Sequence, residues 1–248
     1  MKTVSVLSRK GGAGKTTISV NLGLAAMQQG LRVVVADIDP LRSASEVLRG
    51  REEASSLLIE ATARKLTLLR DTCMANRCDL LIIDTPTAPE EDIVLAMRAA
   101  DLCLAVARPS RLDIAAVQQT LALINRHRAR ALVVLNQCPS MRGDEESDLV
   151  ESALETLRQG GVPVAEARLR SRAAYQRAFA ENQSVTEWDA ASQSAADVRR
   201  LLAEVQAQLA SPAIYDERIA KLRTAAGELR VAGPGLMADL LRKMRLAS

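Results

Sequence analysis

A glycine-rich segment near the start of the chain, residues 8–17, constrains the fold more than any other feature. It reads S-R-K-G-G-A-G-K-T-T. Glycines let a turn bring its backbone N–H groups close to an anion, because no Cβ blocks the approach. Lys15 adds a positive charge, and Thr16 supplies a hydroxyl that suits Mg²⁺. A strand before it (Thr3–Leu7) and a helix after it would complete a phosphate-binding loop, since helix N-termini attract phosphate.

The loop departs at one position from the general phosphate-loop pattern. That pattern, G-x-x-x-x-G-K-S/T, requires a glycine where this chain has Arg9. The chain instead carries a second lysine, Lys10, so that a lysine stands at each end of the loop. The residues that we expect to contact a nucleotide here are Lys10, Gly11, Gly12, Ala13, Gly14, Lys15, Thr16 and Thr17.

Carboxylates follow two further predicted strands. The apolar run Arg32–Ala36 ends in D-I-D-P, which places Asp37 and Asp39 at the strand's carboxyl end, and a second run ends in Asp84. Parallel sheets bind ligands at that edge, and carboxylates are suited to holding Mg²⁺ or its waters. Taken alone, a D-x-D motif or a strand that ends in Asp is at least as often part of an ordinary solvated loop as of a binding site. Behind a phosphate loop, they predict a magnesium site made by Thr16 and these three aspartates.

The rest of the chain to residue 210 alternates between strands and helices. This order predicts an α/β fold with a doubly wound, mostly parallel sheet and helices on both faces. The expected strands are Leu57–Ala61 at an edge, Asp79–Asp84, Asp101–Ala107 and Ala131–Asn136, and the expected helices are Thr17–Gln29, Ser43–Gly50, Ala63–Ala75, Pro89–Ala99, Leu112–His127, Asp144–Gln159 and Ala195–Leu209.

Asn136 is a candidate for adenine recognition. It closes a predicted strand, and its amide can both donate to and accept from a purine edge. The alternative is that it only forms a turn, since Asn is a preferred loop residue.

Composition excludes several other classes of protein. Four cysteines form no C-x-x-C pair, so neither a zinc site nor a disulfide framework is indicated, and buried thiols in a reducing cytoplasm are expected. No apolar run approaches the roughly 18 residues of a membrane span. The sequence therefore predicts a soluble cytoplasmic protein.

The densest basic stretch of the chain lies between residues 168 and 177. Arginines interleaved with Tyr175 can follow a phosphate backbone without reading its sequence, although an ordinary solvated face has the same composition. The helix near residue 200 extends the stretch. The candidate DNA-binding residues are Arg168, Arg170, Arg172, Arg177, Arg199 and Arg200.

Ser211-Pro212 marks the predicted domain boundary. Residues 1–210 form the nucleotide-binding domain, and residues 211–248, which hold the net excess of basic residues, form a helical extension. Its last helix, Leu236–Leu246, is basic and amphipathic. Three alternatives stay open for it: packing on the core, docking on a partner, or lying on an anionic membrane.

The motifs K-G-G-A-G-K-T-T, D-I-D-P and D-T-P (Asp84-Thr85-Pro86), at their spacings, resemble the deviant Walker A ATPases of the ParA/MinD family. The resemblance covers about residues 1–210 and is strongest to the short plasmid-type ParA partition proteins. It implies a P-loop NTPase fold that binds ATP and Mg²⁺. Two positions differ from the family's usual pattern, Leu41 after D-I-D-P and Thr87 after D-T-P.

The resemblance also implies roles for the site residues. Lys15 and the loop amides would hold the β- and γ-phosphates, and Thr16 would ligate Mg²⁺. Asp39 would orient the attacking water, with Asp37 and Asp84 in the metal's outer shell. Lys10 would reach across an ATP-dependent homodimer to the partner's phosphates, which makes Lys10, Lys15 and Asp39 the expected catalytic residues.

By the same resemblance, the ATP-bound dimer would bind DNA nonspecifically and localise to the nucleoid. A ParB-like or cargo-adaptor protein would stimulate slow hydrolysis and release the dimer, so that a plasmid, chromosome region or protein assembly is positioned. The alternative is a MinD-like membrane switch that uses the Leu236–Leu246 helix. A metallocluster carrier of the wider superfamily is disfavoured by the absence of a C-x-x-C motif.

Overall fold

The computed structural model describes residues 1–141, 143, 145–158 and 162–211. The compact unit that carries the predicted site runs from Met1 to Leu209. The predicted extension beyond residue 211, with its helix 236–246, lies outside the described residues.

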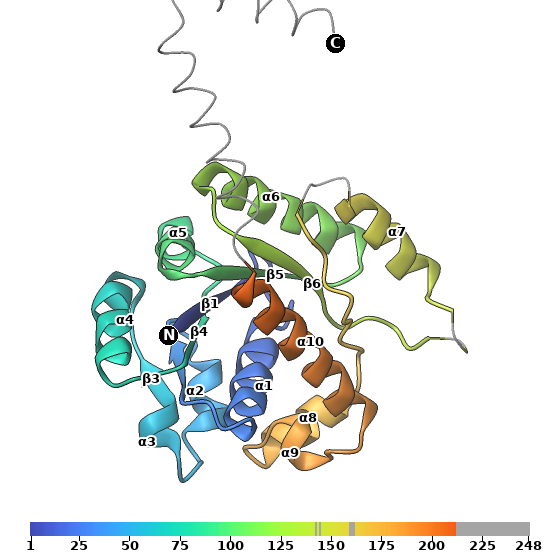
Figure 1. Cartoon of the computed structure of the whole chain (residues 1–248). Helices are drawn as coiled ribbons and strands as arrows, with labels where there is room; N and C mark the ends of the chain where they lie inside the picture. Colours follow the sequence, from blue (N-terminus) through green and yellow to red (C-terminus); the bar gives the residue numbers. More distant parts are fainter. Residues whose placement is uncertain (142, 144, 159–161, 212–248) are drawn as a thin grey trace, which may run out of the picture. The chain divides into compact units, whose positions relative to one another are not determined.

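Six parallel strands form one sheet in the order β3-β2-β4-β1-β5-β6 (Figure 1). The predicted first strand is central, and the short strand β3 is at an edge, as expected. The strands are β1 Lys2–Leu7, β2 Val33–Asp37, β3 Leu58–Glu60, β4 Leu80–Asp84, β5 Leu102–Ala107 and β6 Ala131–Leu135.

Helices cover both faces of this sheet. Figure 1 shows α5, α6 and α7 over one face and α1 and α10 over the other. The helices are α1 Lys15–Gln28, α2 Ser43–Leu48, α3 Ala54–Leu57, α4 Leu66–Ala75 after the 3₁₀ turn η1 Ala63–Lys65, α5 Glu90–Ala99, α6 Arg111–His127, α7 Asp148–Arg158, α8 Ala174–Ala180, α9 Val185–Trp188 and α10 Gln193–Ala210.

Side chains along the central strands point alternately to the two faces of the sheet, where they pack into two separate hydrophobic cores. In β5, Leu104 and Val106 pack into the core beneath α1 and α10, whereas Cys103 and Ala105 pack into the core beneath α5 and α6. A strand buried on both faces needs apolar side chains at every position, which explains its continuous apolar run. The doubly wound α/β fold is therefore confirmed.

One predicted helix begins later in the structure than expected. The helix expected from residue 144 begins at Asp148, because Glu146 is drawn into an ion pair with Arg170 and Ser147 accepts the first helical hydrogen bonds from Val150 and Glu151. Beyond α7, the segment after Pro163 makes two isolated parallel bridges, Val164 with Val133 and Arg170 with Cys138. All four cysteines are buried thiols, as predicted. None of the described helices has the length and apolar character of a membrane span.

Candidate functional site

The glycine-rich loop joins β1 to α1 in a conformation that its glycines make possible. Gly12 and Gly14 have positive φ angles of 72° and 96°, and Gly14 is the residue that precedes α1. A Cβ on Gly14 would lie 1.9 Å from Nδ2 of Asn136, whereas Cβ atoms on Gly11 and Gly12 would meet nothing within 4 Å. The loop is therefore packed tightly at Gly14 and open beside Gly11 and Gly12, where an anion can approach the backbone.

Two amides from the end of β6 hold the loop from behind. Nδ2 of Asn136 donates to the Ala13 carbonyl at 2.8 Å, and Nε2 of Gln137 donates to the Gly12 carbonyl at 2.9 Å. The Asn136 side chain is buried behind the loop. Its amide thus holds the loop in this structure, and adenine recognition by Asn136 stays a prediction. The sequence contains no signal that would have predicted this role or that of Gln137.

Asp84 stands at the carboxyl end of β4, beside the first turn of α1. Its Oδ2 accepts a hydrogen bond from Thr16 Oγ1 at 2.7 Å and its Oδ1 accepts one from Ser19 Oγ at 2.9 Å. Burial raises the pKa of Asp84 to about 7, although the hydrogen bonds from Thr16 and Ser19 oppose this shift. Thr16 and Asp84 were predicted to serve the same metal site, whereas Ser19 was not predicted to take part.

Asp37 lies beside Asp84 in the paired register of β2 and β4. Its Oδ2 accepts hydrogen bonds from the backbone N–H of Ser45 at 2.9 Å and from the Ser45 hydroxyl at 2.7 Å. Its Oδ1 accepts one from the backbone N–H of Asp39 at 3.1 Å. The structure thus brings Asp37 to the site, where it fixes the turn that carries Asp39 and the start of α2.

Asp39 is half-buried and remains the more available of the two carboxylates. Its Oδ1 accepts a hydrogen bond from the backbone N–H of Leu41 at 3.0 Å, which closes a local turn. The Leu41 side chain is 77 % exposed. The Leu41 backbone thus supports Asp39, while its side chain points to solvent.

Lys15 lies in the first turn of α1 and is buried. Burial lowers the pKa of its amine, while the charges of Asp84 and Asp39 raise it. A buried ammonium beside an open glycine loop suits a phosphate, whose negative charge would offset the cost of burying the amine.

The side chains at the site fit a magnesium ion that also takes phosphate oxygens. Within the described part of the chain, no group of three His, Cys, Asp or Glu side chains forms a metal site by itself. Mg²⁺ is usually held by few protein oxygens together with substrate phosphates and waters. The Thr16 hydroxyl, with Asp84 hydrogen-bonded to it, is an arrangement of this kind.

Lys10, the second lysine of the loop, is held within its own chain. Its Nζ lies 2.7 Å from Oδ2 of Asp113, which is in the first turn of α6. Oδ1 of Asp113 accepts a second hydrogen bond from Arg108 Nε at 2.9 Å, and its Oδ2 also accepts one from the hydroxyl of Ser110, the N-cap of α6. Sequence reasoning missed Asp113, although S-R-L-D at residues 110–113 has the spacing of a capping box.

Four of the arginines predicted to bind DNA are paired with carboxylates, three of them in the stretch 168–177. Arg170, 8 % exposed, makes two hydrogen bonds to Glu146 at 2.7 and 2.5 Å, and Arg168 lies 3.6 Å from the same carboxylate. Arg172 lies 2.6 Å from Asp197. Tyr175, predicted to interleave this patch, is buried in the core. These pairs neutralise the stretch, so its role as an exposed DNA-binding patch is not supported for Arg170.

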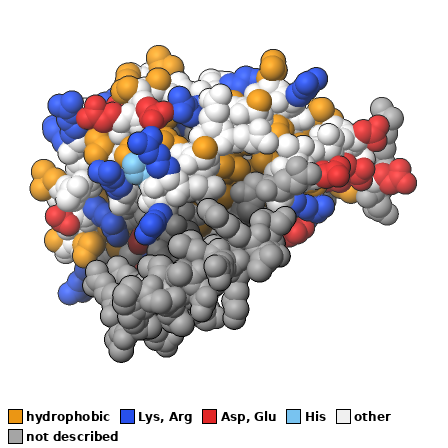
Figure 2. Space-filling model, turned by 90° about the horizontal axis from the view of Figure 1, so that it is seen from above, with side chains coloured by type: hydrophobic (Ala, Val, Ile, Leu, Met, Phe, Trp, Pro, Cys, Tyr) orange, Lys and Arg blue, Asp and Glu red, His pale blue; other side chains and the backbone are white. Residues whose placement is uncertain are grey.

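The candidate arginines on α8 and α10 are exposed. Arg177 is on α8, and Arg199 and Arg200 are on α10, where Arg199 donates to the Ala190 carbonyl and Arg200 lies 3.6 Å from Asp197. A separate basic group, including the exposed Arg126 and Arg128, surrounds the chain's single histidine at the end of α6 (Figure 2).

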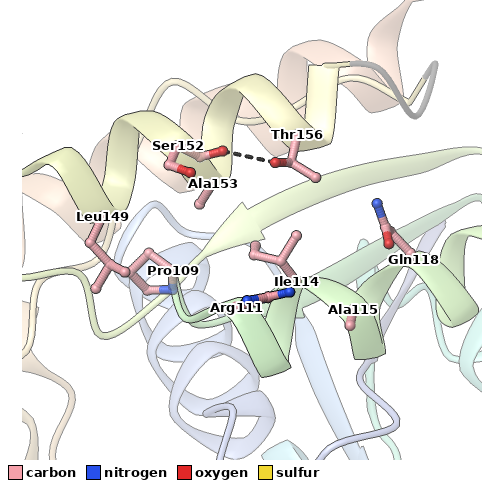
Figure 3. Close-up of a pocket in the computed structure, with 9 residues that line it drawn as sticks. All are labelled: Pro109, Arg111, Ile114, Ala115, Gln118, Leu149, Ser152, Ala153 and Thr156. Atoms are coloured by element: carbon pink, nitrogen blue, oxygen red, sulfur yellow. Dashed lines mark hydrogen bonds between the residues drawn. The ribbon is translucent and has the colours of Figure 1, made fainter.

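A groove of about 410 Å³ lies between α6 and α7. Figure 3 shows Ile114 and Pro109 on one side of it and Leu149 and Ala153 on the other. Pro109 belongs to the same loop as Arg108 and Ser110. The groove is therefore adjacent to the segment that holds Lys10, but it is separate from the phosphate loop.

Comparison with known families gives a match over residues 4–185 to the CobQ/CobB/MinD/ParA nucleotide binding domain. The chain belongs to this family. The predicted ParA/MinD membership is confirmed, and the loop, Lys15 and Asp84 are parts of a nucleotide-binding domain.

Several relatives are similar over most of their length. Maintenance of carboxysome distribution protein A of Gloeobacter kilaueensis is 33 % identical over 82 % of this chain and 94 % of the relative. The protein of the same name from Halothiobacillus neapolitanus is 32 % identical, over 82 % of this chain and 95 % of the relative. Protein ParA of Rhizobium radiobacter is 30 % identical, over 72 % and 82 %.

Solved structures share the fold at lower identity. Apo McdA of Cyanothece has a TM-score of 0.70 and is 19 % identical, covering 84 % of this chain and 99 % of the other. MinD of Pyrococcus horikoshii, a complex with Mg-ADP, has a TM-score of 0.67 at 19 % identity, covering 82 % and 95 %. An ATP complex of a Cyanothece McdA variant has a TM-score of 0.64 at 19 % identity, covering 86 % and 98 %.

Proposed function

We propose that this chain is a positioning ATPase that cycles between an ATP-bound dimer and a released state. The observation that carries the proposal is the site itself: an open glycine loop flanked by Lys10 and Lys15, with Thr16 hydrogen-bonded to Asp84 beside it. Membership of the ParA/MinD family and the similarity to carboxysome distribution proteins and a ParA support a cargo-positioning role.

In the proposed site, MgATP lies over the loop. The backbone N–H groups of Gly11–Thr17 and the Lys15 amine bind the β- and γ-phosphates, and the Thr16 hydroxyl faces the metal. Asp39 orients the attacking water from the turn that Asp37 fixes. Phosphoryl transfer depends mainly on positioning and charge stabilisation, which these groups supply.

The second half of the proposal concerns Lys10. We assign to it a role in trans, on the nucleotide of a second copy of this chain, where it offsets charge that develops in the transition state. A site completed only by dimerisation makes hydrolysis slow and responsive to partners, which suits a switch.

The proposed targets of the ATP-bound dimer are nonspecific DNA and a cargo adaptor. Phosphate contacts are expected from the exposed arginines Arg177 and Arg199, and from Arg200, which is exposed although it lies 3.6 Å from Asp197. Arg168 and Arg172 are partly neutralised by their pairs. The dimer would therefore localise to the nucleoid in the cytoplasm. A ParB-like or adaptor protein would stimulate hydrolysis and reset it.

The catalytic assignment is tested with Lys15→Ala and Asp39→Ala. We expect Lys15→Ala to abolish nucleotide binding, because it removes the buried charge that faces the phosphates. Asp39→Ala should bind ATP normally, lose hydrolysis and accumulate as a dimer, as measured by ATPase assay and sedimentation. An Asp39→Ala protein with wild-type turnover would refute the role of Asp39.

The DNA assignment is tested by binding to random-sequence DNA with ATP or ADP over a salt series. We expect binding with ATP only, weakening steeply as salt rises because contacts to phosphates release counterions. Arg177→Glu with Arg199→Glu should weaken binding and reduce the salt slope. Arg126→Glu with Arg128→Glu, a matched pair on the other basic group, should not. Equal DNA binding with ATP and ADP would contradict the proposed switch.

A further inference from the structure

Two of the four buried cysteines lie together at the end of α4. Cys73 is in the last turn of this helix, and Cys78 stands between the helix and β4. The two thiols are close enough to hydrogen-bond to each other. Cys103 and Cys138 are buried elsewhere, in β5 and after the end of β6. Cys73 and Cys78 therefore form a dithiol, whereas the other two cysteines lie in separate parts of the fold.

The end of α4 has the hydrogen bonds of a Schellman motif. The backbone N–H of Cys78 donates to the Cys73 carbonyl at 2.9 Å. Inside this ring, the N–H of Arg77 donates to the Met74 carbonyl at 3.0 Å, and Arg77 has a positive φ of 56°. In this motif the first and last residues of the turn commonly bring apolar side chains into contact. Here two thiols make that contact.

This turn holds the two sulfur atoms where a disulfide can form. A disulfide requires Cα atoms within about 7 Å of each other and side chains that point toward one another. The 2.9 Å hydrogen bond between the two backbones keeps the Cα atoms within that distance, because only the short bonds of the peptide groups add to it. The contact between the thiols meets the second condition. Closing the bond thus requires side-chain rotation and no movement of the backbone.

A cavity of about 530 Å³ gives a small reagent a route to the dithiol. Cys73 and Cys78 both line it, together with apolar side chains such as Ile59 of β3. Ser56 and Asn76, which are exposed, also line it, so the cavity opens to solvent. Its largely apolar lining favours an uncharged reagent over a charged one.

The two thiols differ in how readily they lose a proton. Burial raises the pKa of both thiols, to about 11 for Cys73. The hydrogen bond between them raises the pKa of Cys73 further and opposes the rise at Cys78. The thiolate is the form that attacks a disulfide. Cys78 is therefore the attacking group, and the raised pKa values make the reaction slow.

We propose that Cys73 and Cys78 form a redox site that low-molecular-weight disulfides oxidise reversibly. The Cys78 thiolate attacks one sulfur of the small disulfide, which forms a mixed disulfide and releases one small thiolate. The Cys73 thiol then loses its proton, and its sulfur attacks Cys78 Sγ and displaces the second small thiolate. The two released thiolates take up the two protons. Two protein thiols are thus oxidised by two electrons, while the small disulfide is reduced to two thiols.

This site is separate from the nucleotide site. Cys78 precedes β4 at the amino end of the strand, whereas Asp84 ends the strand at the edge that carries the glycine loop. The inference therefore does not depend on the proposed ATPase cycle, and either can fail without the other.

The competing explanation is that the two thiols only supply the apolar contact of the turn. To separate the two, the folded full chain is treated for several hours with bis(hydroxyethyl) disulfide, a small uncharged probe. Remaining thiols are then blocked with N-ethylmaleimide in urea, and the chain is digested with trypsin. Because trypsin cleaves after Arg70, Arg77 and Arg98, the disulfide would join two otherwise separate peptides, 71–77 and 78–98.

We expect mass spectrometry to show the joined peptides forming at least about tenfold faster than any modification of Cys103 or Cys138, because those thiols are buried without a route to solvent through this cavity. Equal rates at all four cysteines, or joined peptides only when urea is present during oxidation, would overturn the proposal. This measurement uses the wild-type chain and does not depend on the folding of any variant.

Single variants test the order of attack. Cys73→Ala should accumulate a mixed disulfide on Cys78, because no second thiol displaces it, whereas Cys78→Ala should leave Cys73 largely unmodified. Cys103→Ala is the matched control for the loss of a buried thiol, and it should form the joined peptides at the wild-type rate. Equal yields of mixed disulfide in Cys73→Ala and Cys78→Ala would refute the assignment of Cys78 as the attacking thiol.

Thermal unfolding tests whether the backbone accommodates the bond. The oxidised wild-type chain should melt at the same temperature as the reduced chain or higher, since a cross-link restricts the unfolded chain. Dithiothreitol should restore the separate peptides and the melting temperature of the reduced chain. A lower melting temperature after oxidation, or a bond that dithiothreitol does not reverse in the folded chain, would overturn the inference of a reversible site closed without backbone movement.

Discussion

At the scale of single residues, the site depends on one close approach between distant parts of the chain. Gly14 has a positive φ, and its Cα faces the Asn136 amide that supports the loop. Gly11, two residues before the buried Ala13, has open space where a Cβ would be. The glycines of the loop therefore serve different purposes: Gly14 permits packing, and Gly11 leaves room for a ligand.

This difference gives a matched pair of substitutions. Gly14→Ala should lower the melting temperature and abolish ATP binding, because its Cβ would overlap the Asn136 amide and L residues are strained at this φ. Gly11→Ala should keep the stability of the wild type, since its Cβ meets nothing. Thermal unfolding and binding of a fluorescent ATP analogue measure both effects. A Gly14→Ala protein that binds ATP like wild type would disprove this packing argument.

Asp84 gives a prediction about pH. Its pKa is about 7 in the folded chain and about 4 in an unfolded one. The folded state thus keeps a proton that the unfolded chain releases, so the contribution of Asp84 to stability declines as pH rises from about 4 to about 7. Asp84→Asn removes this decline.

In nucleotide-free protein, Asp84→Asn should therefore gain stability over wild type as pH rises, by roughly 2–4 kcal/mol at pH 8, since one pKa unit corresponds to about 1.4 kcal/mol. Urea unfolding at several pH values measures the difference. With MgATP present the order should reverse, because the variant lacks the charge beside the metal. A difference that does not change with pH would argue against the shifted pKa.

At the scale of elements, the sequence predicted those parts of the molecule that local patterns encode. Continuous apolar runs identified the buried strands, and the glycine loop and D-I-D-P identified the site at their carboxyl ends. The sequence did not predict contacts between elements far apart in the chain, such as Asn136 with Ala13 or Lys10 with Asp113. Such contacts follow from strand order, which brings β1 between β4 and β5, and no local pattern records that order.

The arginine-rich stretch of residues 168–177 likewise makes contacts with distant residues that the sequence did not predict. Composition alone counted Arg170 with the exposed arginines, but the structure joins it to Glu146 and to the Pro139 carbonyl, where it ties the segment before α8 to the segment before α7. The hydrogen bonds from Arg170 also hold the pKa of Glu146 below its usual value. An arginine held in such a pair stabilises the fold and is less available to bind a ligand.

We therefore predict that Arg170→Ala lowers the free energy of unfolding by about 3 kcal/mol, because it removes both charged hydrogen bonds to the partly buried Glu146 and leaves it only Arg168 at 3.6 Å. Arg177→Ala, at an exposed position on α8, should change it by less than about 0.5 kcal/mol. Urea unfolding of the two variants makes the comparison. Equal stabilities would return Arg170 to the set of arginines available for DNA.

At the scale of the whole molecule, the nucleotide site is built from segments that follow four strands of one sheet. The loop follows β1, Asp39 follows β2, Asp84 ends β4, and the segment with Asp113 follows β5. A substitution that shifts any of these strands would therefore displace part of the site. All four lie within the unit Met1–Leu209, so nucleotide binding and DNA binding are not expected to require the predicted basic amphipathic helix of residues 236–246, whose apolar stripe includes Leu240 and Leu241.

This expectation separates the nucleoid proposal from a membrane switch. Leu240→Glu with Leu241→Glu, in the full chain, replaces the centre of the apolar stripe with charges that an anionic lipid surface repels. We expect the variant to keep ATP hydrolysis and ATP-dependent DNA binding. Neither the variant nor the wild type should float with vesicles that contain anionic lipid. The membrane switch would instead be favoured if the wild type floats with ATP, the variant does not float, and neither protein binds DNA. Dimerisation would then double the number of weak lipid-binding helices per particle and so multiply their apparent affinity.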